Sequence, residues 1–115
     1  DTYALIEIAD GNKNYERYLE SDAVTLRDNL AELFYFLLKK YDEKIALFFF
    51  EKFLKIAVDL PPTVIPRAMI FRHHHVKKHF SYIDCFGYSY ALFTKRLFLT
   101  GDRAFQGLEN VEVVR

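Results

Sequence analysis

The chain has 115 residues, with 16 acidic and 16 basic side chains and therefore no formal net charge. A length of this order fits one domain around a single hydrophobic core, and the lack of positive excess argues against a protein that coats duplex nucleic acid. Hydrophobic residues make up 51% of the chain, so we expect apolar surface to remain for a partner. No apolar run approaches the ~20 residues of a membrane span, and no signal peptide is visible. A single cysteine, Cys85, excludes an internal disulfide and predicts a reducing, cytoplasmic environment.

The first half of the chain reads mainly as helices. Residues 1–9 carry apolar side chains at helical spacing and are followed by the helix-ending pair Gly11-Asn12. Residues 14–20 predict a second short helix, and residues 23–26 a brief β-prone run. A longer helix then shows a clear apolar stripe, formed by Leu30, Leu33, Phe34, Leu37, Leu38 and Tyr41.

Residues 43–57 predict a helix with more apolar surface than one core contact requires. One stripe, which we expect to face the core, consists of Ile45, Phe48, Phe49, Phe53 and Ile56. A second stripe consists of Leu47, Phe50 and Leu54. The second stripe indicates contact with another subunit or a partner peptide, or else a helix sandwiched between a sheet and its neighbours.

The second half alternates strands with helices. Residues 56–60 read as a strand closed by Pro61-Pro62, and Thr63 is expected to cap a helix over residues 64–78. Ser81 begins the next helix, whose predicted buried face consists of Ile83, Phe86, Gly87, Tyr90 and Ala91. Because glycine is unfavourable inside a helix, Gly87 suggests a close approach of a neighbouring segment.

A fully apolar strand over residues 97–102 stops abruptly on Gly101-Asp102, and a helical turn and a last strand over 111–114 follow. Such a strand is typical of a central parallel strand covered on both faces. The alternation predicts an α/β fold, a three-layer sandwich with a mainly parallel sheet of four to five strands flanked by helices.

Two aspartates stand where an α/β sheet usually binds ligands. Asp102 follows the apolar strand, and Asp84 lies at the head of the preceding helix. Both also have a structural interpretation. Asp102 suits a turn or a helix cap, and Ser81-x-x-Asp84 fits a capping box. From the residues alone, the structural interpretation of Asp102 is favoured.

The other polar clusters indicate less. His73-His74-His75 cannot converge on one ion, because adjacent helical residues diverge by about 100°. Between Asp59 and Asp84 the chain has no acid, so the basic side chains there predict either a basic face or an ordinary solvated helix surface; they are Arg67, Arg72, Lys77 and Lys78. Cys85 shows no catalytic partner.

Four motifs in order resemble a known family. They are Asp1-Thr2-Tyr3-Ala4, Asn29-Leu30-Ala31-Glu32, Ser81-Tyr82-Ile83-Asp84 and Thr100-Gly101-Asp102, with a similar ending at Ala104-Phe105. The ordered set resembles the PIN domain, the nuclease fold of VapC-type toxins and their archaeal relatives. Two features depart from the pattern. The family's first strand would precede Asp1, and Cys85-Phe86-Gly87 stands where small residues are more usual.

The resemblance implies a divalent-metal-dependent endoribonuclease acting on single-stranded RNA, the toxin of a toxin–antitoxin pair, with a homodimer or an antitoxin as partner. With it, Arg67, Arg72, Lys77 and Lys78 are expected to track the RNA backbone. It implies Asp1, Asp84 and Asp102 as ligands of Mg²⁺ or Mn²⁺, Glu32 as a ligand of a second ion or of a metal-bound water, and Thr100 or Thr2 as holding a carboxylate or the attacking water. Two carboxylates ~4 Å apart repel by roughly 4 kcal/mol at an effective dielectric near 20, which a hard cation would offset. Three alternatives stay open: a PIN-like nuclease on structured RNA or DNA, an inactive RNA-binding module, and a receiver-like phosphoacceptor.

Overall fold

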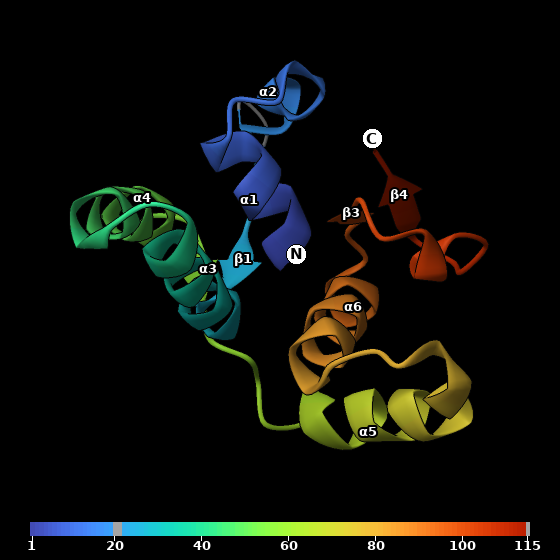
Figure 1. Cartoon of the computed structure of the whole chain (residues 1–115). Helices are drawn as coiled ribbons and strands as arrows, with labels where there is room; N and C mark the ends of the chain where they lie inside the picture. The colour runs from blue at the N-terminus through green and yellow to red at the C-terminus, as the bar shows by residue number, and fades with distance from the viewer. Residues whose placement is uncertain (20–21, 115) are drawn as a thin grey trace. The chain divides into compact units, whose positions relative to one another are not determined.

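A computed structural model describes residues 1–19 and 22–114. The chain divides into two compact units (Figure 1). We call Thr2–Asp59 the N-terminal unit, and Leu60–Arg115 together with Asp1 the C-terminal unit. The single domain expected from the sequence stays a prediction.

The N-terminal unit combines helices with one short parallel sheet. Its elements are α1 (Thr2–Ala9), α2 (Lys13–Leu19), β1 (Thr25–Leu26), α3 (Arg27–Lys40), α4 (Glu43–Leu54) and β2 (Ala57–Val58). The strands β1 and β2 pair in parallel, with Thr25 opposite Ala57. All the elements predicted for this half are present. The helix expected over 14–20 ends at Leu19, and Glu20 lies outside the described residues.

The core of the N-terminal unit forms where α3 and α4 lie side by side (teal and green in Figure 1). Leu30, Leu33 and Leu37 of α3 are buried because their spacing places them on one helical face. Phe53 of α4 is buried against this face, as is Leu5 of α1.

One face of α4 differs from the prediction. Phe48, expected in the core stripe, is 62% exposed, whereas Phe50 is half-buried with its ring edge-on to Phe34. Leu47 and Leu54 are exposed as well. Within the N-terminal unit the helix is therefore not sandwiched; its buried face centres on Ala46 and Phe53, half a turn from the exposed one.

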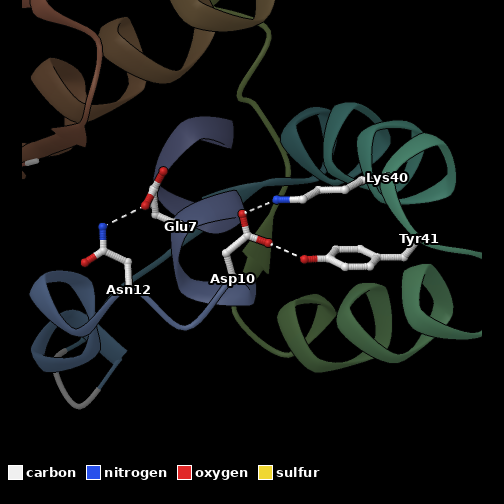
Figure 2. A network of polar contacts seen from close by, with 5 residues as sticks. All are labelled: Glu7, Asp10, Asn12, Lys40 and Tyr41. Carbon is white, nitrogen blue, oxygen red and sulfur yellow. Dashed lines mark hydrogen bonds and ion pairs between the residues drawn. The ribbon is translucent and has the colours of Figure 1, made fainter.

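Polar contacts hold the end of α1 against the end of α3 (Figure 2). Asp10 accepts hydrogen bonds from Lys40 Nζ and from the Tyr41 hydroxyl, both at 2.8 Å. Beside this pair, Asn12 donates to Glu7 at 2.7 Å. Burial alone would raise the pKa of Asp10, but the hydrogen bonds from Lys40 and Tyr41 outweigh it and hold the pKa below its ordinary value.

The C-terminal unit has the same mixture of helices and short parallel strands. Its elements are α5 (Val64–His74), the 3₁₀ turn η1 (Val76–Lys78), α6 (Tyr82–Thr94), β3 (Phe98–Thr100), the 3₁₀ turn η2 (Arg103–Phe105) and β4 (Val111–Val113). β3 and β4 pair in parallel, with Leu99 opposite Glu112. The helix predicted over 64–78 ends early, at His74. Thr63, expected to cap it, is itself helical in backbone and makes no side-chain cap.

Aromatic rings fill the core of the C-terminal unit. Phe80 stacks on Phe105 with ring centroids 4.2 Å apart, and Phe98 and Tyr88 complete the cluster. The predicted close approach at Gly87 is present, because a Cβ there would lie 3.1 Å from the Phe98 ring. The predicted buried face of α6 was partly wrong. Cys85, Tyr88 and Ser89 are buried with Ala91, whereas Ile83, Phe86 and Tyr90 are only half-buried.

The fold is thus mixed α/β with parallel strand pairing. Each described sheet has two strands, and residues 1–19 and 22–114 do not show the central sheet of four to five strands that the sequence predicts. The strands coincide with the β-prone runs of the sequence but are shorter. Within the described ranges, none of the helices combines the length and apolar character that a bilayer crossing demands.

Candidate functional site

A buried threonine connects two of the predicted site residues in the C-terminal unit. Thr100, at the end of β3, is fully buried. Its hydroxyl donates to Asp1 Oδ2 at 2.6 Å and accepts a hydrogen bond from the Asp102 backbone nitrogen at 3.0 Å. The Asp1 nitrogen in turn donates to the Leu99 carbonyl oxygen at 3.0 Å. Asp1 and Asp102 are therefore both held by hydrogen bonds to the last residues of β3, Leu99 and Thr100.

Asp102 also has the structural role that its sequence position suggested. Its Oδ1 accepts a hydrogen bond from the Ala104 nitrogen at 2.9 Å and so caps η2. The carboxylate is half-buried, and its other oxygen accepts no hydrogen bond from the described residues. Capping thus uses one oxygen and leaves the second for a ligand.

Asp84 forms the capping box that its spacing predicted. Its Oδ2 accepts from the Ser81 nitrogen at 3.0 Å, and the Ser81 hydroxyl accepts from the Asp84 nitrogen at 3.0 Å. These reciprocal bonds satisfy two backbone donors at the start of α6. They fix Asp84 at the head of the helix, half-buried, with one carboxylate oxygen engaged.

Glu32 belongs to the N-terminal unit, where a second threonine holds it. Thr2 Oγ1 donates to Glu32 Oε1 at 2.7 Å and accepts from Asn29 Nδ2 at 2.9 Å. Asn29 is 2% exposed. Sequence reasoning missed Asn29, although a polar residue on the apolar face of a strong helix is a signal that a buried partner exists.

The predicted ligands are all oxygen donors, as a hard cation requires, but the structure does not gather all of them around one point. Among the residues that the structure describes, no three His, Cys, Asp or Glu side chains are arranged to hold a metal ion. Mg²⁺, however, is commonly bound through one or two carboxylates, with water and substrate phosphate completing its shell. Asp1 and Asp102, joined through Thr100, meet that smaller requirement in donor type, since every donor is an oxygen. The wider ligand set with Asp84 and Glu32 stays a prediction.

The basic residues lie on α5 and the turn after it. Arg67, Lys77 and Lys78 are exposed. Arg72 is half-buried, donates from Nε to the Phe80 carbonyl oxygen at 3.2 Å and stacks its guanidinium on the Tyr82 ring at 4.6 Å. Arg72 therefore has a structural role, while the other three present charge to solvent.

The thiol of Cys85 is unsuited to nucleophilic chemistry. It is fully buried, and burial, with the neighbouring Asp84 charge as a lesser cause, raises the pKa of Cys85 to about 11. His73 and His74 are exposed on α5, as expected of a solvated surface.

Comparisons with protein-family models, with curated proteins and with solved structures gave no match to this chain.

Proposed function

We propose that this protein is a divalent-metal-dependent endoribonuclease of PIN type that hydrolyses phosphodiester bonds of single-stranded RNA as the toxin of a toxin–antitoxin pair. The proposal rests on the ordered motifs of the sequence. One structural observation supports it most: Thr100 joins Asp1 and Asp102, which lie 101 positions apart in the chain, at the carboxyl end of a parallel strand.

Some side chains would bind the metal ion, and others position those ligands. Asp1 and Asp102 would bind the ion, with Asp84 as a third ligand. Thr100 positions Asp1, because its buried hydroxyl already accepts from the Asp102 nitrogen and must point its hydrogen toward Asp1 Oδ2. Glu32 is the further acid that the family resemblance adds.

A bound Mg²⁺ or Mn²⁺ supplies charge stabilisation at the phosphodiester and lowers the pKa of a bound water. Arg67, Lys77 and Lys78 are the exposed cations available to the RNA backbone. The three-layer sandwich with a longer parallel sheet, typical of the PIN family, is part of the same proposal.

The decisive experiment compares cleavage by the wild type and Asp102→Asn on labelled single-stranded RNA, with Mn²⁺ or Mg²⁺ and with chelator. Asparagine retains the oxygen that caps η2, so the fold should persist while a charged ligand is lost. We expect cleavage by the wild type only, dependent on the ion, and a rate loss of about 100-fold or more in the variant.

The matched control is Asp42→Asn. Asp42 caps α4 through Oδ1 in the same way, at 2.9 Å from the Ile45 nitrogen, but is not a predicted ligand. The Asp42→Asn variant should cleave RNA at the same rate as the wild type. Equal activity in Asp102→Asn and Asp42→Asn would contradict the assignment of Asp102. Duplex RNA and single-stranded DNA in the same assay distinguish the alternative nuclease substrates.

A second candidate is an RNA-binding module without catalysis. The capping roles of Asp84 and Asp102 favour this candidate, because helix capping by itself accounts for an acid at each position. It predicts RNA binding that is lost in an Arg67→Glu, Lys77→Glu, Lys78→Glu variant, with the RNA intact after long incubation with Mn²⁺.

A further inference from the structure

Tyr82, the first residue of α6, is a large aromatic side chain that is held in place and is still 57% exposed. The Arg72 guanidinium lies over one face of its ring, with the central carbon 4.6 Å from the ring centroid. Arg72 is fixed in turn, because its Nε donates to the Phe80 carbonyl oxygen at 3.2 Å. A ring that is covered on one face and remains mostly exposed presents its other face to solvent.

The backbone that carries this ring is fixed as well. The capping box of Ser81 and Asp84 spans Tyr82 and holds the first turn of α6 through two hydrogen bonds of 3.0 Å. A flat ligand that stacks on Tyr82 therefore meets a surface already in its final geometry. Binding of this kind orders few protein groups, which favours affinity.

The charge around Tyr82 favours a polyanion. Residues 60–83 contain no acid. Lys77 and Lys78 of η1 come shortly before α6 in the chain, and both are exposed. Proteins that bind single-stranded nucleic acid combine cations that follow the phosphates with aromatic faces on which bases stack. The segment from η1 to the first turn of α6 supplies both.

Other exposed rings beside a cation lack part of this setting. Phe93 is 45% exposed and has the Arg67 guanidinium carbon 5.6 Å from its ring centroid, but it lies near the end of α6 that is remote from the capping box. Tyr35 is 62% exposed under Lys39 Nζ at 4.5 Å, but it belongs to α3 of the N-terminal unit. Tyr82 shares its helical turn with a predicted metal ligand.

We propose that the open face of Tyr82 is a stacking platform for one nucleobase of single-stranded RNA. The proposal rests on the proposed function for its ligand, and it names a subsite beside the candidate ligand Asp84. Stacking does not read hydrogen-bonding edges, so the platform accepts any base. A purine, which has the larger ring, should bind more tightly than a pyrimidine.

The chain contains no tryptophan, which makes an optical test possible. In Tyr82→Trp the single indole keeps a stacking face, and its fluorescence is quenched when a base stacks on it. The probes are a short oligoadenylate and an abasic RNA of the same length, titrated in chelator so that metal-dependent cleavage does not occur. We expect saturable quenching by oligoadenylate and little quenching by abasic RNA, which carries the same phosphates.

Tyr35→Trp is the matched control, because Tyr35 is also exposed beside a cation and is not a predicted RNA contact. Its indole should not respond to oligoadenylate.

Affinity provides a second, independent readout. Tyr82→Leu keeps an apolar side chain but removes the aromatic face, so labelled oligoadenylate should bind about tenfold more weakly in fluorescence anisotropy. Its affinity for abasic RNA should equal that of the wild type. Tyr82→Phe, which loses the hydroxyl alone, should bind both probes as the wild type does. Circular dichroism checks that each variant is folded.

The stacking platform and the nuclease assignment fail in different ways. Cleavage by the wild type, with equal oligoadenylate affinity in Tyr82→Leu and the wild type, would overturn the platform and leave the nuclease. Base-dependent quenching in Tyr82→Trp, with RNA intact in every metal, would support the platform and overturn the nuclease. Equal quenching by the two probes would overturn the platform, since it would reflect the phosphates alone. A wild type that binds neither probe would overturn it as well.

Discussion

The two units use the same polar device in different ways. In the C-terminal unit the Thr100 hydroxyl donates to a carboxylate, Asp1, and accepts from a backbone nitrogen, that of Asp102. In the N-terminal unit the Thr2 hydroxyl donates to a carboxylate, Glu32, and accepts from a side-chain amide, that of Asn29. Thr100 is fully buried and Thr2 half-buried. The threonine that donates to Asp1 is fully buried and is itself fixed by a backbone nitrogen. The threonine that donates to Glu32 is half-buried and is fixed by one side chain, Asn29, whose place water can take.

The largest effect is expected from Thr100→Val. Valine keeps the shape and suits a strand, but it removes the acceptor for the Asp102 nitrogen and the hydroxyl that donates to Asp1 Oδ2, at a side chain that is fully buried. Losing such a pair costs about 1–3 kcal/mol of unfolding free energy. Urea denaturation measures it, and Thr100→Ser, which keeps the hydroxyl, should be much closer to the wild type. Equal stability of Thr100→Val and the wild type would show that the buried chain of hydrogen bonds contributes nothing.

A smaller effect is expected from Asn29→Leu. The substitution keeps approximate volume and removes the donor to Thr2, but water can replace that donor at a half-buried hydroxyl. We expect a loss of about 0.5–1.5 kcal/mol in urea denaturation. Because Asn29 and Glu32 act through the same hydroxyl, adding Thr2→Val should cost less than the two single losses combined. Strict additivity would contradict the coupling.

The smallest effect is expected at the other end of α1, from Asp10→Asn. Its folded-state pKa is lowered, so the ionised form contributes stability above its ordinary pKa of 3.8, and this contribution disappears as pH falls through the lower folded value. The Lys40 pKa is raised by its hydrogen bond to Asp10, so its share is lost only as pH rises beyond 10.5. Asparagine should therefore lower stability slightly at neutral pH and not in strong acid.

Denaturation of wild type and Asp10→Asn at about pH 7 and about pH 2 checks this difference. Asparagine can still accept from Tyr41 but loses the second oxygen that accepts from Lys40, so the change of the loss with pH, and not its size at one pH, reports the ionisation of Asp10. A loss of equal size at both pH values would mean that the hydrogen bonds to Asp10 matter and its ionisation does not.

Local signals in the sequence predicted most of the elements. The stripe of Leu30, Leu33 and Leu37 and the Ser81–Asp84 capping box were both read correctly, because each depends on residues within a few positions of one another. Phe48 was misplaced because an apolar residue near the edge of a stripe can face either way, and tertiary packing against α3 decides. The Thr63 cap failed because its backbone is helical, which sequence does not reveal.

The candidate site was predictable only in its residue types. That Asp1 and Asp102 share a threonine depends on a contact between residues 99 positions apart, which no local pattern contains. The ordered motifs suggested which acids matter. One of them includes Asn29 but assigns it no role, because that role is defined by the hydroxyl it contacts.

Because Cys85 is buried, its alkylation rate can report the opening of the C-terminal unit. It is the only cysteine, it lies in the aromatic core of the C-terminal unit, and its thiol is both covered and, with a pKa of about 11, reluctant to ionise. An alkylating reagent will therefore label it only when that unit opens, so the labelling rate follows the opening of one half of the molecule while the other remains silent. Thiol trapping can accordingly separate two stabilities that a melting curve would blend into one.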